Sequence, residues 1–173
     1  MLDRRSALAS AKPYASPVLQ IGEARGFSLL QVAGPSKALS PVTGKLPSKV
    51  GVATQNDGRI LMRTGENQFW IIGPENDDIA EKLNGIAILT PLSHSRTRIF
   101  IEGAPARDVL SKGIPLDFHP TVFKPGTFAM TGLHHTPVLV HCTSENRFEI
   151  YALRTFALSL HDWLTDAALE FCR

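Results

Sequence analysis

Two segments of this chain that lie 79 residues apart have nearly the same sequence. Residues 64–71 and 143–150 align without a gap and match at five of eight positions, namely Thr, Glu, Asn, Phe and Ile. Each segment has the pattern of a β-hairpin that leads into a helix, and such repetition indicates a duplicated fold, with a chance match as the alternative. The sequence therefore predicts an α+β fold of two split β-α-β halves, ferredoxin-like, that share one core.

The length of 173 residues is typical of one domain of ordinary size. We place the duplicated domain at residues 17–173, with halves at roughly 17–90 and 91–173. Residues 1–16 mix Arg, Ser, Ala and Pro without apolar periodicity. They are therefore expected to form an arm outside the core that becomes ordered against a partner.

Hydrophobic periodicity and turn residues predict the elements along the chain. Strands are expected at residues 17–23, 27–33, 59–64, 68–73, 86–89, 97–102, 128–133, 136–143 and 147–153. Helices are expected at 77–83 and after Pro105, and an apolar stripe over 153–171 predicts a last helix, on which Trp163 extends the buried face. Residues 34–49, rich in Pro, Ser, Gly and Lys, are expected to be a long loop.

The charge of the chain argues against one class of partner and favours another. The formal net charge of +2 is too small to indicate nucleic-acid binding. Residues 1–50 carry seven Lys or Arg against two acidic residues, a net charge of +5, while the remainder is net −3. A basic front end could dock on an acidic partner, with Arg4 and Arg5 as the expected contacts, and a solvated tail is the alternative.

Membrane and secretory features are not expected either. No apolar run reaches the roughly 18 residues that a membrane helix needs, and residues 1–15 lack the apolar stretch of a secretory signal. The two cysteines, Cys142 and Cys172, are too few for a disulfide framework. These features predict a soluble, cytoplasmic protein with ordinary thiols.

No familiar catalytic or cofactor motif occurs in the sequence. The six histidines have none of the spacings of metal sites, and there is no nucleophile elbow, phosphate loop or dinucleotide fingerprint. We therefore predict no catalytic residue, no metal site and no cofactor bound by this chain alone. The densest polar cluster supplies Ser93, His94 and Arg96 as candidate contacts for a ligand or an interface, with structural roles as the alternative.

Several longer stretches resemble a known family. They are residues 92–97 (LSHSRT), 103–110 (GAPARDVL), 112–120 (KGIPLDFHP), 123–126 (FKPG), 154–157 (RTFA) and 162–168 (DWLTDAA). This spaced set is similar to the gamma subunit of heterotetrameric sarcosine oxidase. The resemblance covers nearly the whole chain, from residues 5–8 (RSAL) onward.

The resemblance implies a place in a complex that oxidatively demethylates sarcosine to glycine. In that family the gamma subunit is not known to carry the redox chemistry. The expected partners are the alpha, beta and delta subunits of sarcosine oxidase. FAD, FMN, NAD and tetrahydrofolate are expected in those partners.

A more distant resemblance is to the aminomethyltransferase of glycine cleavage, whose folate-binding fold is a duplicated α+β unit. That family has a Thr-Gly-Glu-x-Gly-x-Glu stretch in which a glutamate helps to hold folate. The matching residues here are 143–149, with Glu145 in the place of that glutamate. Ser144 and Arg147 replace the two glycines, which removes the freedom for positive φ and close backbone approach. Glu145 and Arg147 are thus candidate ligand or interface residues.

Two functional hypotheses remain from the sequence. The first is a non-catalytic interaction subunit of a sarcosine oxidase complex. The second is a stand-alone tetrahydrofolate-binding protein related to aminomethyltransferase. A one-carbon transferase is the least favoured alternative, because the sequence offers no poised acid–base pair.

Overall fold

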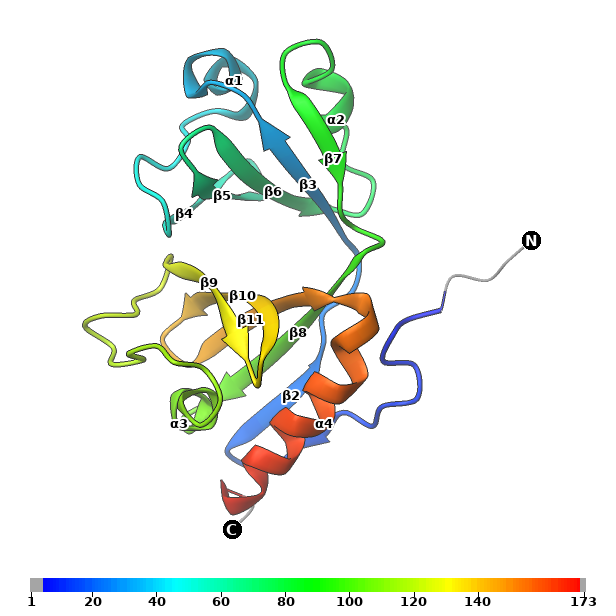
Figure 1. The fold of residues 1–173 in the computed structure, drawn as a ribbon, viewed down its shortest axis with the longest axis vertical. Coiled ribbons are helices and arrows are strands. Elements are labelled where there is room, and N and C mark those ends of the chain that lie inside the picture. Colours follow the sequence, from blue (N-terminus) through cyan, green and yellow to red (C-terminus); the bar gives the residue numbers. More distant parts are fainter. Residues whose placement is uncertain (1–4, 172–173) are drawn as a thin grey trace. The chain divides into compact units, whose positions relative to one another are not determined.

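The computed structural model describes residues 5–171, and the chain divides into two compact units. Unit 1 holds the chain up to Ala24, then Ser95–Pro125, and the chain from Ala129 onward. Unit 2 holds Arg25–His94 and Gly126–Phe128. Each unit has an antiparallel sheet with helices (Figure 1), so the predicted mixed α+β fold is confirmed. The prediction of one shared core is wrong, because each unit has its own cluster of buried residues.

Unit 2 is built on a five-stranded sheet of order β4-β5-β6-β3-β7. Its elements are β3 (Phe27–Ala33), α1 (Ser36–Thr43), β4 (Ala53–Asn56), β5 (Arg59–Gly65), β6 (Gln68–Pro74), α2 (Ile79–Lys82) and β7 (Ile88–Pro91). Alternation along the strands places Val32, Phe69 and Ile71 in one cluster of buried residues. Leu39 from α1 and Ile79 from α2 complete this core.

Unit 1 is built on a six-stranded sheet of order β1-β2-β8-β11-β10-β9. Its elements are β1 (Tyr14–Ala15), β2 (Leu19–Glu23), β8 (Arg96–Gly103), α3 (Ala106–Ser111), β9 (Phe128–Leu133), β10 (Thr136–Ser144), β11 (Arg147–Leu153) and α4 (Ala157–Ala168), with short 3-10 turns at Arg154–Phe156 and Leu169–Phe171. Val109 and Leu110 of α3, and Leu160 and Leu164 of α4, pack in one core with the apolar face of the sheet. The helical stripe predicted over residues 153–171 is therefore a core face at Leu160 and Leu164, whereas Leu153 lies in β11 and Phe156 is 41% exposed.

The two sheets repeat one strand order. Strands β4, β5, β6, β3 and β7 of unit 2 correspond in order to β9, β10, β11, β8 and β2 of unit 1. The two predicted hairpins are present as β5–β6 and β10–β11. Their ladders even shift at matching places, between Arg63 and Gly65 and between Cys142 and Ser144. The internal repeat of the sequence thus corresponds to a repeated structural unit.

The division between the units differs from the two contiguous halves that we predicted at 17–90 and 91–173. Strand β2 lies in the first half of the sequence, but it pairs with β8 in unit 1. Leu19 and Ile21 of this strand are buried in the core of unit 1. Burial and strand pairing, rather than chain order, decide where a strand belongs, so a split by sequence position misplaces β2.

The prediction of an arm outside the core is wrong for the described part of residues 1–16. Leu8 is only 5% exposed and belongs to the core of unit 1, and Tyr14 forms part of β1. The Ser6 hydroxyl donates to Glu23 at 2.5 Å, and the Tyr14 hydroxyl donates to the Ala168 carbonyl at 3.3 Å. One buried side chain, Leu8, and a few hydrogen bonds hold this segment against unit 1. A single buried residue gives no periodic pattern, so the sequence did not reveal it.

The predicted loop at 34–49 contains a helix instead. Helix α1 has Pro35 at its N-cap and Pro41 inside it, and proline composition led the sequence to predict a loop. The fully buried Leu39 anchors the helix to the core of unit 2. Tertiary packing therefore outweighs the local preference of this segment.

Candidate functional site

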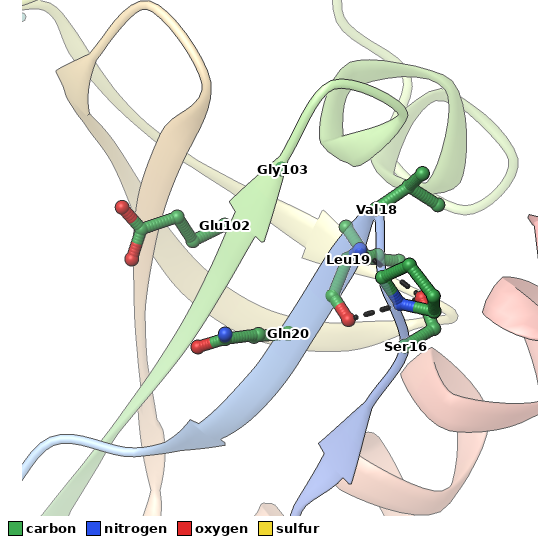
Figure 2. Close-up of a pocket in the computed structure, with 7 residues that line it drawn as sticks. Ser16, Val18, Leu19, Gln20, Glu102 and Gly103 are labelled. Carbon is green, nitrogen blue, oxygen red and sulfur yellow. Dashed lines mark hydrogen bonds between the residues drawn. The ribbon is translucent and has the colours of Figure 1, made fainter.

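A pocket of about 300 Å³ lies in unit 1, where β2 begins and β8 ends. We call it the β2–β8 pocket; its lining residues are Ser16, Pro17, Val18, Leu19, Gln20, Glu102 and Gly103. Figure 2 shows the side chains of Gln20 and Glu102 on the same side of the strand pair, as expected for directly opposed residues. These groups can hydrogen-bond to a ligand or to a side chain of a partner.

Backbone contacts fix the shape of this pocket. The Ser16 amide donates to the Leu19 carbonyl at 2.8 Å, and the Leu19 amide donates to the Ser16 hydroxyl at 3.1 Å (Figure 2). Gly103 has a φ of 142°, and a Cβ there would lie 2.0 Å from the Val18 carbonyl oxygen. Only glycine allows the ends of β2 and β8 to approach so closely.

Arg147, a residue singled out from the sequence, borders the pocket through Glu102. Its guanidinium forms an ion pair with the Glu102 carboxylate and lies over the Phe100 ring at 4.6 Å. Both charged side chains are partly exposed, so the pair contributes little to stability. Arg147 and Glu102 therefore form a charged surface that remains accessible to a partner.

Glu145 lies at the tip of the β10–β11 hairpin, as predicted, with an exposed side chain. Its backbone carbonyl accepts a hydrogen bond from Nε of Arg107 at 3.1 Å. The same guanidinium donates to the carbonyls of Phe118 and Phe123, at 2.5 and 3.0 Å, and lies over the Phe148 ring at 5.0 Å. Arg107 thus fastens the segment between α3 and β9 to the hairpin tip.

An equivalent clamp occurs in unit 2. Arg63 donates to the Glu66 carbonyl at 2.7 Å and lies over the Phe69 ring at 5.7 Å. Glu66 and Phe69 are the repeat equivalents of Glu145 and Phe148. Because both units bind the hairpin-tip carbonyl in this way, the contact to Glu145 is part of the fold, and the Glu145 carboxylate is left for other contacts.

The other predicted cluster, Ser93, His94 and Arg96, is divided between the two units. Ser93 has a structural role, since its hydroxyl accepts a hydrogen bond from the Leu29 amide at 2.9 Å. The His94 side chain is exposed, and Arg96 contacts the Ser95 hydroxyl at 3.1 Å. Arg96 opposes Leu153, at the end of β8 that is remote from Glu102. Within unit 1, Arg96 is therefore not brought together with Arg147, while Ser93 and His94 belong to unit 2.

The predicted docking arginines are described only in part. Arg4 lies outside the described residues. Arg5 is exposed, and its backbone carbonyl accepts a hydrogen bond from the Arg154 guanidinium. The segment is therefore held through its backbone near Arg5, while the Arg5 side chain faces solvent.

A buried polar group in unit 1 was missed by the sequence reasoning. The Tyr151 hydroxyl donates to the Glu149 carboxylate at 2.9 Å, and Arg98 lies 3.7 Å from the same carboxylate. Burial raises the pKa of Tyr151, with the Glu149 charge adding to the effect. These residues share one face of the sheet by strand register, and that alternation was the signal available in the sequence.

His141 of β10 lies directly opposite Glu149 of β11 and is also buried. Burial lowers its pKa from 6.5 to about 4, and the Glu149 charge opposes this effect only in part. The imidazole is therefore neutral at pH 7. Within residues 5–171, no group of three or more His, Cys, Asp or Glu side chains is arranged to hold a metal ion.

The sequence matches a family model described as the sarcosine oxidase, gamma subunit family, over residues 51–170. The gamma subunit of sarcosine oxidase from Corynebacterium sp. (strain U-96) is 33% identical over 141 residues, which cover 78% of this chain and 69% of that protein. The gamma subunit from Corynebacterium sp. (strain P-1) is 32% identical over 153 residues, which cover 84% of this chain and 75% of that protein.

Two solved structures are also similar. A chain of heterotetrameric sarcosine oxidase from Corynebacterium sp. U-96 superposes with a TM-score of 0.88 at 27% identity, covering 98% of this chain and 97% of that one. Aminomethyltransferase T of the glycine cleavage system from Bartonella henselae superposes with a TM-score of 0.64 at 19% identity, covering 86% of this chain and 46% of that one. The second likeness is one of fold.

Proposed function

Because the chain belongs to the sarcosine oxidase gamma subunit family, we propose that it is the gamma subunit of a complex that oxidatively demethylates sarcosine to glycine. The observation that carries this proposal is the likeness to a chain of the heterotetrameric enzyme, at a TM-score of 0.88 over almost the full length of both chains. A likeness of this extent supports the same place in a complex, rather than a shared fold alone.

In this role the chain is a non-catalytic interaction subunit. Its partners are the alpha, beta and delta subunits, and FAD, FMN, NAD and tetrahydrofolate are held by those partners. The described polar groups support an interaction role, because Glu102 and Arg147 on the surface of unit 1 bind each other and leave accessible charge at the β2–β8 pocket. We propose the same kind of contact for Glu145 at the hairpin tip and for the Ser93, His94 and Arg96 turn.

Co-expression tests this function. The chain, carrying an affinity tag, is produced together with alpha, beta and delta subunits of sarcosine oxidase from the same organism. We expect the tagged chain to retain all three partners and a flavin absorbance, because the complex holds the cofactors in the partner subunits. Recovery of the tagged chain alone, with soluble partners left in the flow-through, would contradict the proposal.

We also propose that the basic N-terminal segment docks on an acidic surface of a partner through Arg4 and Arg5. The exposed Arg5 side chain supports this, since within residues 5–171 the contact that holds Arg5 is made by its backbone carbonyl. Changing both arginines to Glu should weaken assembly, most strongly at low salt, and leave the melting temperature of the lone chain unchanged.

The matched control for that variant is Lys37→Glu with Lys49→Glu, which changes the net charge equally at exposed positions of unit 2. Assembly of the control should stay as in the wild type. If both double variants weaken assembly to the same degree, net charge alone is responsible and the docking role of Arg4 and Arg5 is wrong.

The alternative function, stand-alone tetrahydrofolate binding, rests on the exposed Glu145 carboxylate and on the aminomethyltransferase-like fold. Titration calorimetry with tetrahydrofolate separates the two functions. The gamma-subunit role predicts no heat of binding to the isolated chain. A saturable heat that is lost in Glu145→Gln would favour the alternative.

A further inference from the structure

The outer edge of β7 in unit 2 differs from the matching edge in unit 1. In both sheets a fifth strand pairs with the strand next to it in the repeated order, β7 with β3 and β2 with β8. In unit 1 a sixth strand, β1, then covers β2. In unit 2, β7 is the last strand among the described residues. Among the described residues, the edge at β2 is therefore covered by a further strand, whereas the equivalent edge at β7 is not.

The strand registers identify the matching positions on the two edges. The residues that lie opposite one another across the sheets are Phe69, Val32 and Leu89 in unit 2 and Phe148, Ile101 and Ile21 in unit 1. Phe69 and Phe148 are equivalent in the sequence repeat, so Leu89 corresponds to Ile21. In unit 1, Ile21 is paired on its outer side with Tyr14 of β1. Leu89 is the place where unit 2 would receive an equivalent strand.

The backbone of Leu89 points to the outer side of the sheet. Leu92 directly follows β7 and lies opposite Leu29 of β3, and its amide donates to the Leu29 carbonyl at 2.8 Å. In an antiparallel pair the backbone groups of alternate residues point to opposite sides, so Ile88 faces β3, and Leu89 faces outward. Pro91 also faces outward and lacks an N–H. The edge therefore suits a short ladder centred on Leu89, comparable with the two residues of β1.

The side chains along this edge are uncharged and partly exposed, as expected of a strand that pairs with another strand. Natural edge strands are usually protected by charged residues, and residues 86–91 have none. Ile88 is 74% exposed, and Ile86 is 39% exposed. An incoming extended segment with an apolar side chain opposite Ile88 would bury this surface.

We propose that the outer edge of β7 accepts an extended segment of a partner subunit as a sixth strand of the unit 2 sheet. The inference rests on the proposed function, since it names how this gamma-type chain engages its partner. The segment that covers β2 in unit 1 is residues 14–15 of this chain, which are already in use there. The segment for β7 is therefore supplied by another chain, through backbone hydrogen bonds of the β-augmentation type.

Hydrogen–deuterium exchange of the Leu89 amide tests the pairing directly. In the isolated chain this amide should exchange rapidly, and in the purified complex with the alpha, beta and delta subunits it should slow by at least about tenfold. The Val32 amide, in the middle of the same sheet, is the internal reference and should be protected in both samples. A complex in which Leu89 exchanges as in the isolated chain overturns the edge proposal and leaves the proposed function intact.

Substitution of the exposed isoleucine gives a second readout. Ile88→Lys should lower the affinity for the partner subunits at least about tenfold, because a charged side chain opposes edge pairing. Val50→Lys is the matched control, since Val50 is 59% exposed in the same unit and lies outside the strands. Both variants should melt like the wild type when isolated. Equal affinity of the two variants overturns the edge proposal.

Two further outcomes have defined meanings. If the isolated chain forms a dimer in which the Leu89 amide is protected, the edge pairs with a second copy and a partner-subunit strand is excluded. If the chain fails to co-purify with the alpha, beta and delta subunits at all, the proposed function is overturned, and the edge proposal is overturned with it.

Discussion

At the scale of residues, strands β10 and β11 of unit 1 carry buried titratable side chains, which the strand pattern of the sequence does not indicate. Glu149 and Tyr151 are buried and hydrogen-bonded to each other, and His141 lies opposite Glu149. The alternation of the strands could have revealed that these residues share a face. That the face is buried depends on long-range packing, which local sequence does not specify.

His141 makes the stability of the protein depend on pH. Its folded-state pKa of about 4 lies below the ordinary 6.5, so the unfolded chain binds the proton more readily. The free energy of unfolding should therefore fall as pH decreases from about 6.5 to about 4, by on the order of 3 kcal/mol from this group. Urea unfolding at stepwise pH measures the effect. His141→Gln should flatten the curve in this window, and His94→Gln, at an exposed site, should not.

Gly103 shows that a single backbone position shapes the β2–β8 pocket. Gly103→Ala places a Cβ against the Val18 carbonyl at a φ that is unfavourable for alanine, and should destabilise the chain by about 2–3 kcal/mol. Gly58→Ala is the control, because that glycine also has a positive φ but its Cβ would meet no atom within 4 Å. Thermal unfolding of both variants compares them. Equal losses would show that conformational strain, rather than the close approach, makes glycine necessary.

At the scale of elements, regular strands and amphipathic helices were the predictable part. Both repeated hairpins and the last helix follow from periodicity, because each buries one face. Helix α1 was not predicted, since Pro35 and Pro41 indicate a loop and only the burial of Leu39 fixes the helix. The role of Arg107 could not be predicted, because it donates to backbone carbonyls, which have no sequence signature.

Arg107 should control the order of the segment between α3 and β9. Arg107→Lys loses the several directed donors of the guanidinium, so the carbonyls of Phe118 and Phe123 lose their partner, at a cost of about 2–3 kcal/mol. Hydrogen exchange of the Val122 amide, which donates to the His119 carbonyl, should accelerate. Unchanged exchange and stability would show that the aromatic packing of this segment suffices without the clamp.

Trp163 connects the last helix to the β9–β10 turn. Its ring stacks on His134, with centroids 6.0 Å apart, and it occupies the space beside Gly113 where a Cβ would lie 2.4 Å away. The ring is half-buried rather than fully buried. Trp163→Ala should therefore cost about 2 kcal/mol, less than the 3–5 typical of a fully buried ring. Denaturant unfolding measures it, and a loss above about 4 kcal/mol would place the ring in the core.

At the scale of the whole molecule, the duplication was readable from eight aligned residues, and the family from a spaced set of motifs. The assignment of β2 to unit 1 could not be predicted from the sequence, because it depends on the pairing of Leu19 and Ile21 with a strand about 80 residues later in the chain. The candidate site was predictable to the same degree. The sequence located Glu145 and Arg147 at the hairpin, whereas the β2–β8 pocket, which Arg147 borders through Glu102, depends on the approach of β2 to β8.

As a gamma-type subunit, this chain should occur in the cell within one sarcosine-oxidising complex. Native mass spectrometry of the complex purified from the source cells, through a tag on this chain, tests it most directly. We predict a single assembly that contains one copy each of the alpha, beta, gamma and delta subunits. A spectrum with the free chain, or an oligomer of this chain alone, would contradict it.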